Sequence, residues 1–232
     1  GLGTADLRFT GGEIKALLKG RFGLEVTTEE ALRLEQESEG WITSITLTAH
    51  PLRKGLFKEV LANRGQNSLL FDYMAAEVFR QQPPGIRQVL LATSICNEFD
   101  DELGDALIGT NTSANILEEV ESKNLLMTRL GGPHRWYRYH HLFREFLRDK
   151  LRREDPDRFR SLHRKAAEHY LAKGEPRQAI HYFLQGSELD RATDLLEEQV
   201  ESIAHEGLWE TLEGWLQQIP TERLTTRPKL LL

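Results

Sequence analysis

The sequence predicts a mainly α-helical fold, in which a small helical subdomain is followed by a winged-helix domain with a short β-wing and then by tetratricopeptide-like helical hairpins. Apolar residues recur at the spacing of an amphipathic helix through most of the 232 residues. One short stretch, residues 135–139, alternates aromatic and basic side chains with the period of two that is typical of a strand. Beyond residue 156, small alanines stand where paired helices would cross, as in a helical solenoid.

The first 52 residues are predicted to form helices that are joined by capped turns. Thr10 and Glu13 have the spacing of a capping box at the start of the first helix. Thr27 or Thr28 is expected to cap the second helix, because each hydroxyl stands just before an apolar-periodic segment. The apolar faces of the two helices are predicted to be Ile14, Leu17 and Leu18, and Ala31, Leu32 and Leu34.

Residues 69–155 follow the order of a winged-helix domain. Four helical segments come first, and two short strands separated by a turn then lead into a long helix. The four helices are predicted over residues 69–81, 86–93, 101–108 and 113–123. The strands are predicted over residues 125–127 and 136–138, and the long helix from His140 to just before Pro156.

After Pro156 the chain is predicted to be helical in pairs. The predicted helices cover residues 159–172, 177–184, 189–203 and 208–219, with a glycine in each intervening turn. The residues expected inside the hairpins are Ala166, Ala167, Ala179, Ala192, Trp209 and Trp215. Each hairpin needs a neighbour to cover its apolar face, and the abrupt first and last residues lead us to expect a piece of a longer protein.

Composition restricts the class of protein and its compartment. With 39% hydrophobic and 28% charged residues, the chain can bury a core and does not have the composition of a disordered protein. Cys96 is the single cysteine, which excludes an internal disulfide framework and predicts a reducing, cytoplasmic compartment. We interpret Cys96 as a small buried hydrophobe. No apolar run approaches the roughly 20 residues that span a bilayer, so no membrane partner is expected.

The formal net charge of −6 is spread unevenly along the chain. Residues 129–165 hold twelve basic and five acidic side chains, which gives this stretch a net charge of +7. Such a stretch can meet phosphate, as in nucleic acid, or an acidic neighbouring domain. A solvated helix face explains the same pattern and is the more common case.

The sequence contains no recognisable active site. It has no Gly-rich phosphate loop that ends in Lys-Ser/Thr, no Ser/His/Asp or Cys/His pattern, and no metal-type Cys/His spacing. His163 and His169 are six residues apart and do not share a helix face, so we interpret both, together with His181, as surface or packing residues. The chain by itself is therefore not expected to be an enzyme.

Two histidines, His140 and His141, stand where the predicted strand becomes a helix. The first turn of a helix has unpaired N–H groups and the positive end of the helix dipole, which favour anions and phosphate in particular. A histidine at this place adds one more donor. His140 is therefore either a phosphate-binding residue or a cap or packed polar group, and the residues alone leave both interpretations open.

Four phrases of the sequence, taken in order, resemble one known family. They are Asp6–Thr10 with Glu13, Glu39–Ile42, Tyr137–Leu147 and Leu162–Ala167. Together they resemble the large ATP-dependent LuxR-type transcriptional regulators, the group of the maltose-regulon activator, which belong to the STAND class of signal-transduction NTPases. The resemblance covers nearly the whole chain. It implies the C-terminal part of an NTPase domain with its helical lid (1–52), a linker (53–68), a winged-helix domain (69–155) and the start of a helical-repeat sensor domain (156–232).

The resemblance also implies residues of a nucleotide site. Gly40, Trp41 and Ile42 match a lid turn that packs near the adenine in relatives, with Ile42 at the position of a proline. His140 matches the histidine of a Met-His-Asp motif that contacts the β-phosphate of ADP, with His141 at the aspartate position. ADP or ATP with Mg is implied for the parent protein, and no cofactor is expected to bind tightly to this fragment alone.

What the resemblance implies for function is a nucleotide-switched signal-transduction ATPase that regulates transcription, with a parent protein that is a slow ATPase switch. The winged helix and the lid would close over ADP or ATP bound by an upstream P-loop and would couple this closure to the helical-repeat sensor. The implied partners are the upstream ATPase domain in cis, an inducer or regulatory protein at the repeats, DNA only through a C-terminal domain outside this fragment, and further copies in an activated homo-oligomer. The residues leave one alternative, a non-enzymatic winged-helix and helical-repeat scaffold that binds a protein or DNA partner.

Overall fold

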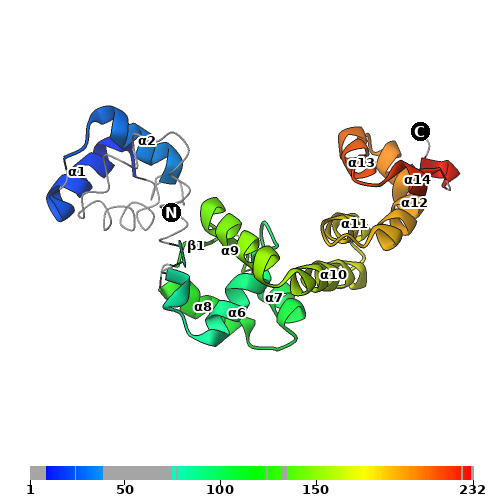
Figure 1. Ribbon diagram of the computed structural model, residues 1–232, viewed down its shortest axis with the longest axis horizontal. Helices are drawn as coiled ribbons and strands as arrows, with labels where there is room; N and C mark the ends of the chain where they lie inside the picture. Colours follow the sequence, from blue (N-terminus) through cyan, green and yellow to red (C-terminus); the bar gives the residue numbers. More distant parts are fainter. Residues whose placement is uncertain are drawn as a thin grey trace. The chain divides into compact units, whose positions relative to one another are not determined.

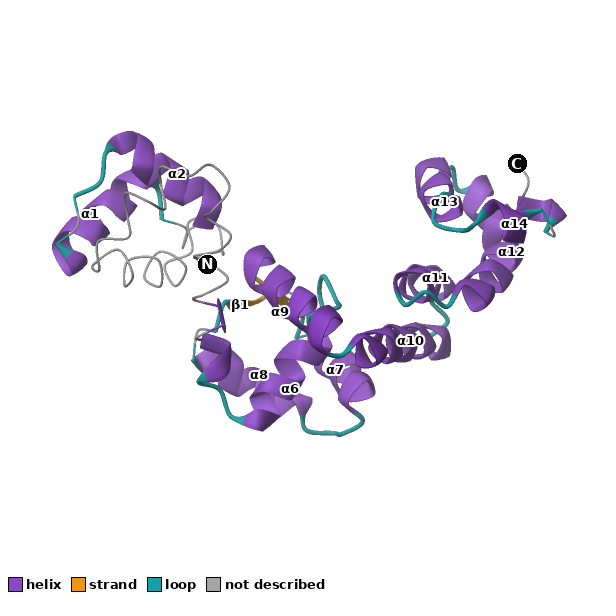
Figure 2. Cartoon of the chain, in the orientation of Figure 1, coloured by secondary structure: helices purple, strands orange, loops and turns teal. Residues whose placement is uncertain are grey.

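The computed structural model describes residues 9–23, 25–38, 75–76, 78–123, 125–131, 135–225 and 227–230. Figures 1 and 2 show that these residues are mostly helical, so the predicted mainly α fold is confirmed. The chain divides into two compact units. The first holds Gly1–Arg87, Glu118–Arg129 and Arg138–Phe146, and the second holds Gln88–Leu117, Leu130–Tyr137 and Leu147–Leu232. No helix in the described part of the chain has both the length and the apolar character that crossing a membrane requires.

The first unit begins with a hairpin of two helices, α1 (Gly11–Phe22) and α2 (Thr28–Ser38). Each of these helices begins with a capping box. The Thr10 hydroxyl accepts a hydrogen bond from the Glu13 N–H, and the Glu13 carboxylate accepts one from the Thr10 N–H. The same reciprocal pair joins Thr27 and Glu30. The predicted capping box of α1 is therefore confirmed, and Thr27 rather than Thr28 caps α2.

Apolar packing holds this hairpin together. Its buried cluster consists of Ile14, Leu18, Val26, Ala31 and Leu34. The prediction that Leu32 belongs to this face is wrong, because its side chain is 52% exposed. The predicted linker over residues 53–68 and the beginning of the predicted helix over 69–81 lie outside the described residues.

The wing is a two-stranded sheet of β1 (Met127–Arg129) and β2 (Tyr137–Tyr139). β1 starts two residues later than predicted. Leu126 has a φ of 54°, in the left-handed region, which an extended strand cannot contain. The chain therefore turns at Leu126 before it becomes a strand, although the residues from Leu125 to Met127 are all apolar and have the composition of a strand.

The helices around the wing fall close to their predicted bounds. They are α6 (Pro84–Thr93), α7 (Asp101–Ile108), α8 (Ser113–Ser122) and α9 (His141–Glu154). Asp100 caps α7 by accepting a hydrogen bond from the Leu103 N–H at 2.8 Å. Asp155 separates α9 from the next helix and caps it, because its carboxylate accepts a hydrogen bond from the Arg158 N–H at 3.0 Å.

The second unit continues as antiparallel helices, seen in Figure 1 as the yellow and orange end of the chain. They are α10 (Pro156–Ala172), α11 (Pro176–Gln185), α12 (Leu189–His205), α13 (Trp209–Leu216), α14 (Thr221–Leu224) and the 3₁₀ helix η2 (Pro228–Leu230). The four alanines predicted at the crossings are fully buried, as expected where small side chains let two helices pack closely. The prediction for the two tryptophans is half right, since Trp215 is buried but Trp209 is 55% exposed at the start of α13.

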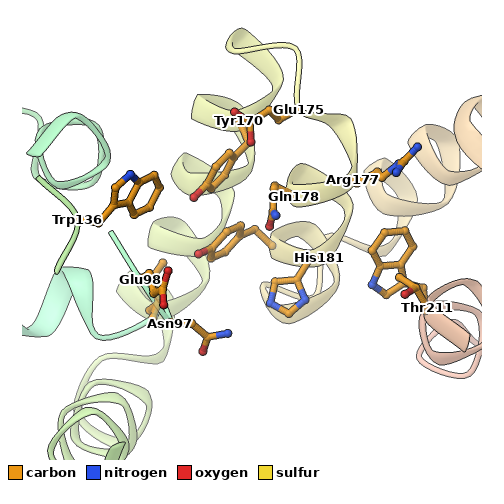
Figure 3. Close-up of a pocket in the computed structure, with 12 residues that line it drawn as sticks. Asn97, Glu98, Trp136, Tyr170, Glu175, Arg177, Gln178, His181 and Thr211 are labelled. Carbon is orange, nitrogen blue, oxygen red and sulfur yellow. The ribbon is translucent and has the colours of Figure 1, made fainter. Parts of the chain in front are cut away.

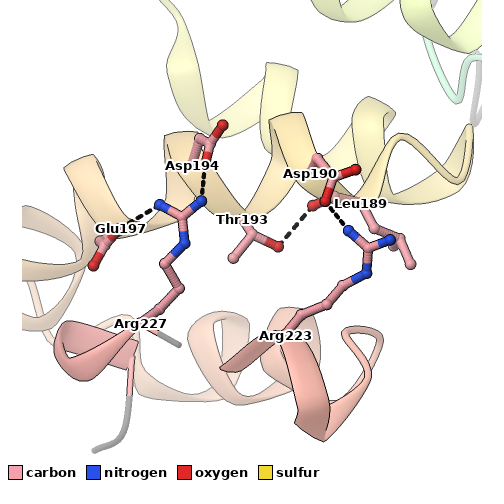
Figure 4. A network of polar contacts seen from close by, with 7 residues as sticks. All are labelled: Leu189, Asp190, Thr193, Asp194, Glu197, Arg223 and Arg227. Atoms are coloured by element: carbon pink, nitrogen blue, oxygen red, sulfur yellow. Dashed lines mark hydrogen bonds and ion pairs between the residues drawn. The ribbon is translucent and has the colours of Figure 1, made fainter. Parts of the chain in front are cut away.

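Charged side chains tie α12 to the segment that follows α13. Asp190, Asp194 and Glu197 share one face of α12, at helical spacing. Arg227 pairs with Asp194 and, at 2.7 Å, with Glu197, while Arg223 pairs with Asp190 (Figure 4). These exposed pairs contribute little to stability, because solvent screens them and ordering long side chains costs entropy.

Candidate functional site

His140 is the residue between the end of β2 and the start of α9. Its N–H donates a hydrogen bond to the Leu126 carbonyl at 2.8 Å, which ties it to the residue just before β1. Its carbonyl accepts the first hydrogen bond of the helix, from the Arg144 N–H at 3.0 Å. The backbone of His140 thus ends the sheet and begins the helix, which confirms the predicted position of this residue at a strand-to-helix boundary.

The side chain of His140 lies among aromatic rings. Its imidazole stacks on that of His141, with ring centroids 4.7 Å apart, and Tyr139 meets Phe143 edge to face beside it. Only 1% of His140 is exposed. A strand-to-helix turn packed in this way orients the ring by contacts on both sides of it.

The backbone N–H groups at this boundary are of the kind that can bind an anion. In a helix whose first hydrogen bond comes from Arg144, the N–H groups of residues 141–143 have no acceptor inside α9, and they point toward the helix start. The dipole of this 14-residue helix adds positive potential at the same place. An imidazole beside such a helix start has the chemistry of a phosphate site, but a phosphate can meet the ring only when His140 becomes accessible from one side.

The other predicted site residues, Gly40, Trp41 and Ile42, lie outside the described residues. Their predicted position near an adenine therefore stays a prediction. The assignment of His141 to an aspartate position also stays a prediction, and the structure adds that its ring stacks on His140.

Some basic side chains in the stretch with a net charge of +7 are paired with acids, most of which belong to the same stretch. Within α9 and α10, Lys150 pairs with Glu154 at 2.5 Å, and Arg160 pairs with Asp157. A third pair lies between helices, where Arg164 approaches Glu188 at 3.5 Å. Exposed pairs of this kind are typical of a solvated helix face.

The first repeat helix packs directly on α7. The Lys165 ammonium donates a hydrogen bond to the Leu107 carbonyl at 2.9 Å, in the last turn of α7, where a cation also interacts well with the helix dipole. About two turns further along, just beyond the end of α10, Lys173 pairs with Glu102 at 2.5 Å. Sequence reasoning missed this contact, because it counted Lys165 as one more charge of a basic stretch.

A buried polar cluster lies beside the α7 and α10 contact. The rings of Tyr170 and Tyr182 stack with centroids 5.4 Å apart, and the Cys96 thiol contacts the Tyr182 hydroxyl. Burial raises the pKa of Tyr170 to about 12, and burial also raises the pKa of Tyr182, so both hydroxyls stay protonated. Cys96 is fully buried, as predicted. It connects the residues before α7 to α10 and α11, which form the first hairpin of the repeats.

Comparison with known proteins agrees with this architecture. Residues 75–159 match the family described as MalT winged helix domain. The HTH-type transcriptional regulator MalT of Serratia proteamaculans is 34% identical over 235 residues, which covers 100% of this chain and 26% of that protein. MalT of Yersinia pestis is 31% identical over the same share of each chain. The serine/threonine-protein kinase PknK of Mycobacterium tuberculosis is 28% identical over 99% of this chain and 21% of the kinase.

These findings confirm the resemblance that the four sequence phrases indicated. The match to the winged-helix family includes His140, both strands of the wing and all of α9. The similarity to MalT extends over the whole chain, so it also includes the α1–α2 hairpin and the helical hairpins. The chain spans about a quarter of the length of the MalT relatives and about a fifth of the kinase.

Proposed function

We propose, from the premise that this chain is a MalT-like STAND regulator segment, that it couples a nucleotide site to a sensor in a protein that regulates transcription. Its winged helix and lid close over ADP or ATP that an upstream P-loop holds, with His140 as a donor to a phosphate. The helical hairpins carry the sensor side of the switch. The nucleotide supplies the charge that the closed state recognises, and this chain supplies donors, packing and the connection to the repeats.

The observation that carries this proposal is the contact of α7 with α10. Lys165 and Lys173 both reach from α10, or its end, to residues of α7, and Cys96 contacts Tyr182 beside them. A switch has two conformational states, and it transmits a signal only if the ligands at its two ends each bind one of these states more tightly than the other. A polar and partly buried contact between the winged-helix region and the first hairpin of the repeats, α10 and α11, is the kind of connection that such transmission needs.

The identity of the relatives supports a coupling role rather than an output role. One relative is named a transcriptional regulator and another a serine/threonine-protein kinase, yet both share this segment along nearly its whole length. A segment common to two such outputs does not itself perform either. We therefore assign DNA binding to a C-terminal domain outside this chain, ATP hydrolysis to the upstream domain in cis, and inducer binding to the repeats, with self-assembly following activation.

Replacing the imidazole of His140 tests the nucleotide role. In the full-length parent protein, His140→Ala should speed ADP dissociation by at least about tenfold, because a hydrogen bond to a charged group contributes about 1.5–3 kcal/mol. Release of a fluorescent ADP analogue measures the rate, and His205→Ala, at the exposed end of α12, is the matched control. A folded His140→Ala protein that retains ADP like the parent would remove the role we assign to this residue.

The coupling step needs a separate variant. Lys165→Met keeps much of the apolar stem but loses the hydrogen bond to the Leu107 carbonyl. We expect ADP release to remain normal in the absence of inducer and the response of ADP release to inducer to weaken. An unchanged response to inducer would show that the α7 and α10 contact does not transmit the signal, while leaving the role of His140 intact.

A further inference from the structure

A cleft of about 700 Å³ opens beside the contact of α7 with α10 (Figure 3). Its walls come from the loop after α6, from the wing residue Trp136, and from helices α10, α11 and α13. The volume is in the range of sites that hold small organic ligands or short peptides. All its walls belong to the second compact unit.

One side of this cleft is aromatic. Tyr170 and Tyr182 stack nearly parallel, at 10° between ring planes, and both are largely buried. Trp136 reaches toward them from the wing, as Figure 3 shows, and remains half-buried. Aromatic rings attract cations through their quadrupoles and also cover apolar stems, and Trp136 is the more exposed of these rings.

The charges around the aromatic side are predominantly negative. Glu98 and Glu175 line the cleft, and their carboxylates belong to the loop after α6 and to the turn after α10. Arg177 is the cation among the lining residues that the structure describes, and its guanidinium is paired with Glu206. Figure 3 places Trp136 beside Tyr170, with Glu175 above Tyr170 and Glu98 below it next to Asn97, and with Arg177 farther along the cleft.

The histidine of the cleft does not offset this charge at neutral pH. Burial, and then the positive charge of Arg148, lower the pKa of His181, so its imidazole is neutral. The negative charge also reaches the rings. Burial raises the pKa of Tyr170 most, and the charges of Asp100 and Glu175 raise it further, which means that both carboxylates lie close enough to act on this hydroxyl.

We propose that this cleft binds a cationic organic ligand, one that places an ammonium or guanidinium group against Trp136 and Tyr170 and between Glu98 and Glu175. Aromatic faces and carboxylates together recognise such groups, since the rings attract the charge and the carboxylates accept its hydrogen bonds. The remaining volume, beside Gln178 and Thr211, accepts the polar body of the ligand. The chemistry fits an extended peptide with an arginine or lysine, and it also fits a free polyamine.

The site stands apart from the nucleotide role of His140. Its lining residues are absent from the four phrases that resemble a known family, and they come from five separate stretches of the chain. A ligand in this cleft touches both the loop before α7 and the first hairpin, so it would bias the same contact through which we propose the signal passes. Failure of the ligand site would leave the nucleotide proposal intact.

Binding of two matched peptides to the full chain tests the proposal. The probe is a fluorescein-labelled pentapeptide, Gly-Ser-Arg-Ser-Gly, and its partner carries citrulline, the neutral isostere of arginine. Fluorescence anisotropy should show that the arginine peptide binds at least ten times more tightly than the citrulline peptide. Spermidine, added as a competitor, distinguishes a small polyamine from a peptide as the source of the cation.

Variants of the cleft then locate the binding. Glu175→Gln should weaken the arginine peptide about fivefold and leave the citrulline peptide unchanged, while Glu198→Gln, on the exposed side of α12, is the matched control. Trp136→Leu should weaken it further. Either the peptide or spermidine binding in this glutamate-dependent way supports the proposal. Equal affinity for arginine and citrulline, insensitivity to Glu175→Gln, or no binding of any probe at millimolar concentration would overturn it.

Discussion

The turns after α10 and after α11 have the same hydrogen bonds but different residues. In the first, the N–H groups of Gly174 and Glu175 return to the carbonyls of Leu171 and Tyr170. In the second, Ser187 and Glu188 bond in the same way to Leu184 and Phe183. Both are Schellman turns, in which one residue after the helix must adopt left-handed backbone geometry.

The two turns differ in where the glycine stands. The left-handed position holds Gly174 in the first turn, at a φ of 74°, but Ser187 in the second, at a φ of 61°. In the second turn the glycine is one residue earlier, at Gly186, in ordinary helical geometry. A Cβ atom on Gly186 would lie 2.9 Å from the Cβ of His163, so the packing of α10 excludes any larger residue there. Contact between helices has therefore overridden the preference of the turn.

The largest expected effect on the free energy of unfolding comes from His163, the residue whose packing requires a glycine at position 186. The residue is fully buried, and its Nδ1 lies 2.9 Å from the Phe159 carbonyl, while its Nε2 has no hydrogen-bond partner in the described part of the chain. Burial lowers the pKa of His163 from 6.5 to about 4, and the charges of Arg148 and His181 lower it too, against the hydrogen bond to Phe159. The folded state thus holds this imidazole neutral over a range in which the unfolded chain protonates it.

The sign of the resulting pH dependence follows from the lowered pKa. His163 contributes its full stability above about pH 6.5, and the contribution falls by about 3 kcal/mol as the pH drops to about 4, since each pKa unit corresponds to about 1.4 kcal/mol. Urea unfolding from pH 7 to 4 should therefore show a weaker pH dependence in His163→Leu than in the exposed control His205→Leu. Equal pH dependence of the two variants would mean that His163 is hydrated in the folded state.

Gly186 gives the next largest effect. In its helical geometry an alanine would be preferred by up to about 1 kcal/mol from backbone propensity alone, yet the close approach to His163 should reverse the sign. We expect Gly186→Ala to lower the free energy of unfolding by about 2 kcal/mol, as urea denaturation at pH 7 would measure. Lys173→Ala, at the equivalent position of the first turn, loses only an exposed ion pair and should cost less than about 1 kcal/mol. A stabilised Gly186→Ala protein would show that α10 and α11 separate easily.

These details explain which parts of the fold the sequence predicts. Local signals predict local structure well, as the capping box of Thr10 and Glu13 and the helix after His140 show. They fail where a distant contact decides, as at Gly186, or where the backbone departs from what composition favours, as at Leu126. The prediction that Trp209 is buried is wrong because helical spacing shows only which side chains share a face of α13. Whether that face is covered depends on residues elsewhere in the chain.

The candidate site likewise has features that the sequence predicts and features that it does not. The position of His140 follows from a change of period between neighbouring residues, so the sequence predicts it, whereas the burial of its ring does not follow from that period. The cleft has no sequence signal at all. Glu98 and Glu175 stand 77 positions apart in the sequence and line the same cleft because Cys96 and the residues beside it pack on α10 and α11.

The smallest expected changes in the free energy of unfolding come from substitutions at the left-handed positions of the two turns. These substitutions test the backbone geometry directly, because it is almost the only feature that they change. A Cβ atom at position 174 would meet nothing within 4 Å, so Gly174→Ala should cost about 1 kcal/mol from left-handed geometry alone. Ser187→Gly makes the opposite change in the second turn and should raise the free energy of unfolding by about 0.5 kcal/mol, because relief of the left-handed strain slightly exceeds the added freedom of the unfolded chain. Urea midpoints at constant slope measure both changes. If Ser187→Gly were destabilising, the serine hydroxyl would have to stabilise the turn by more than its backbone strain costs. The two turns would then differ by a side-chain contact as well as by the packing of His163.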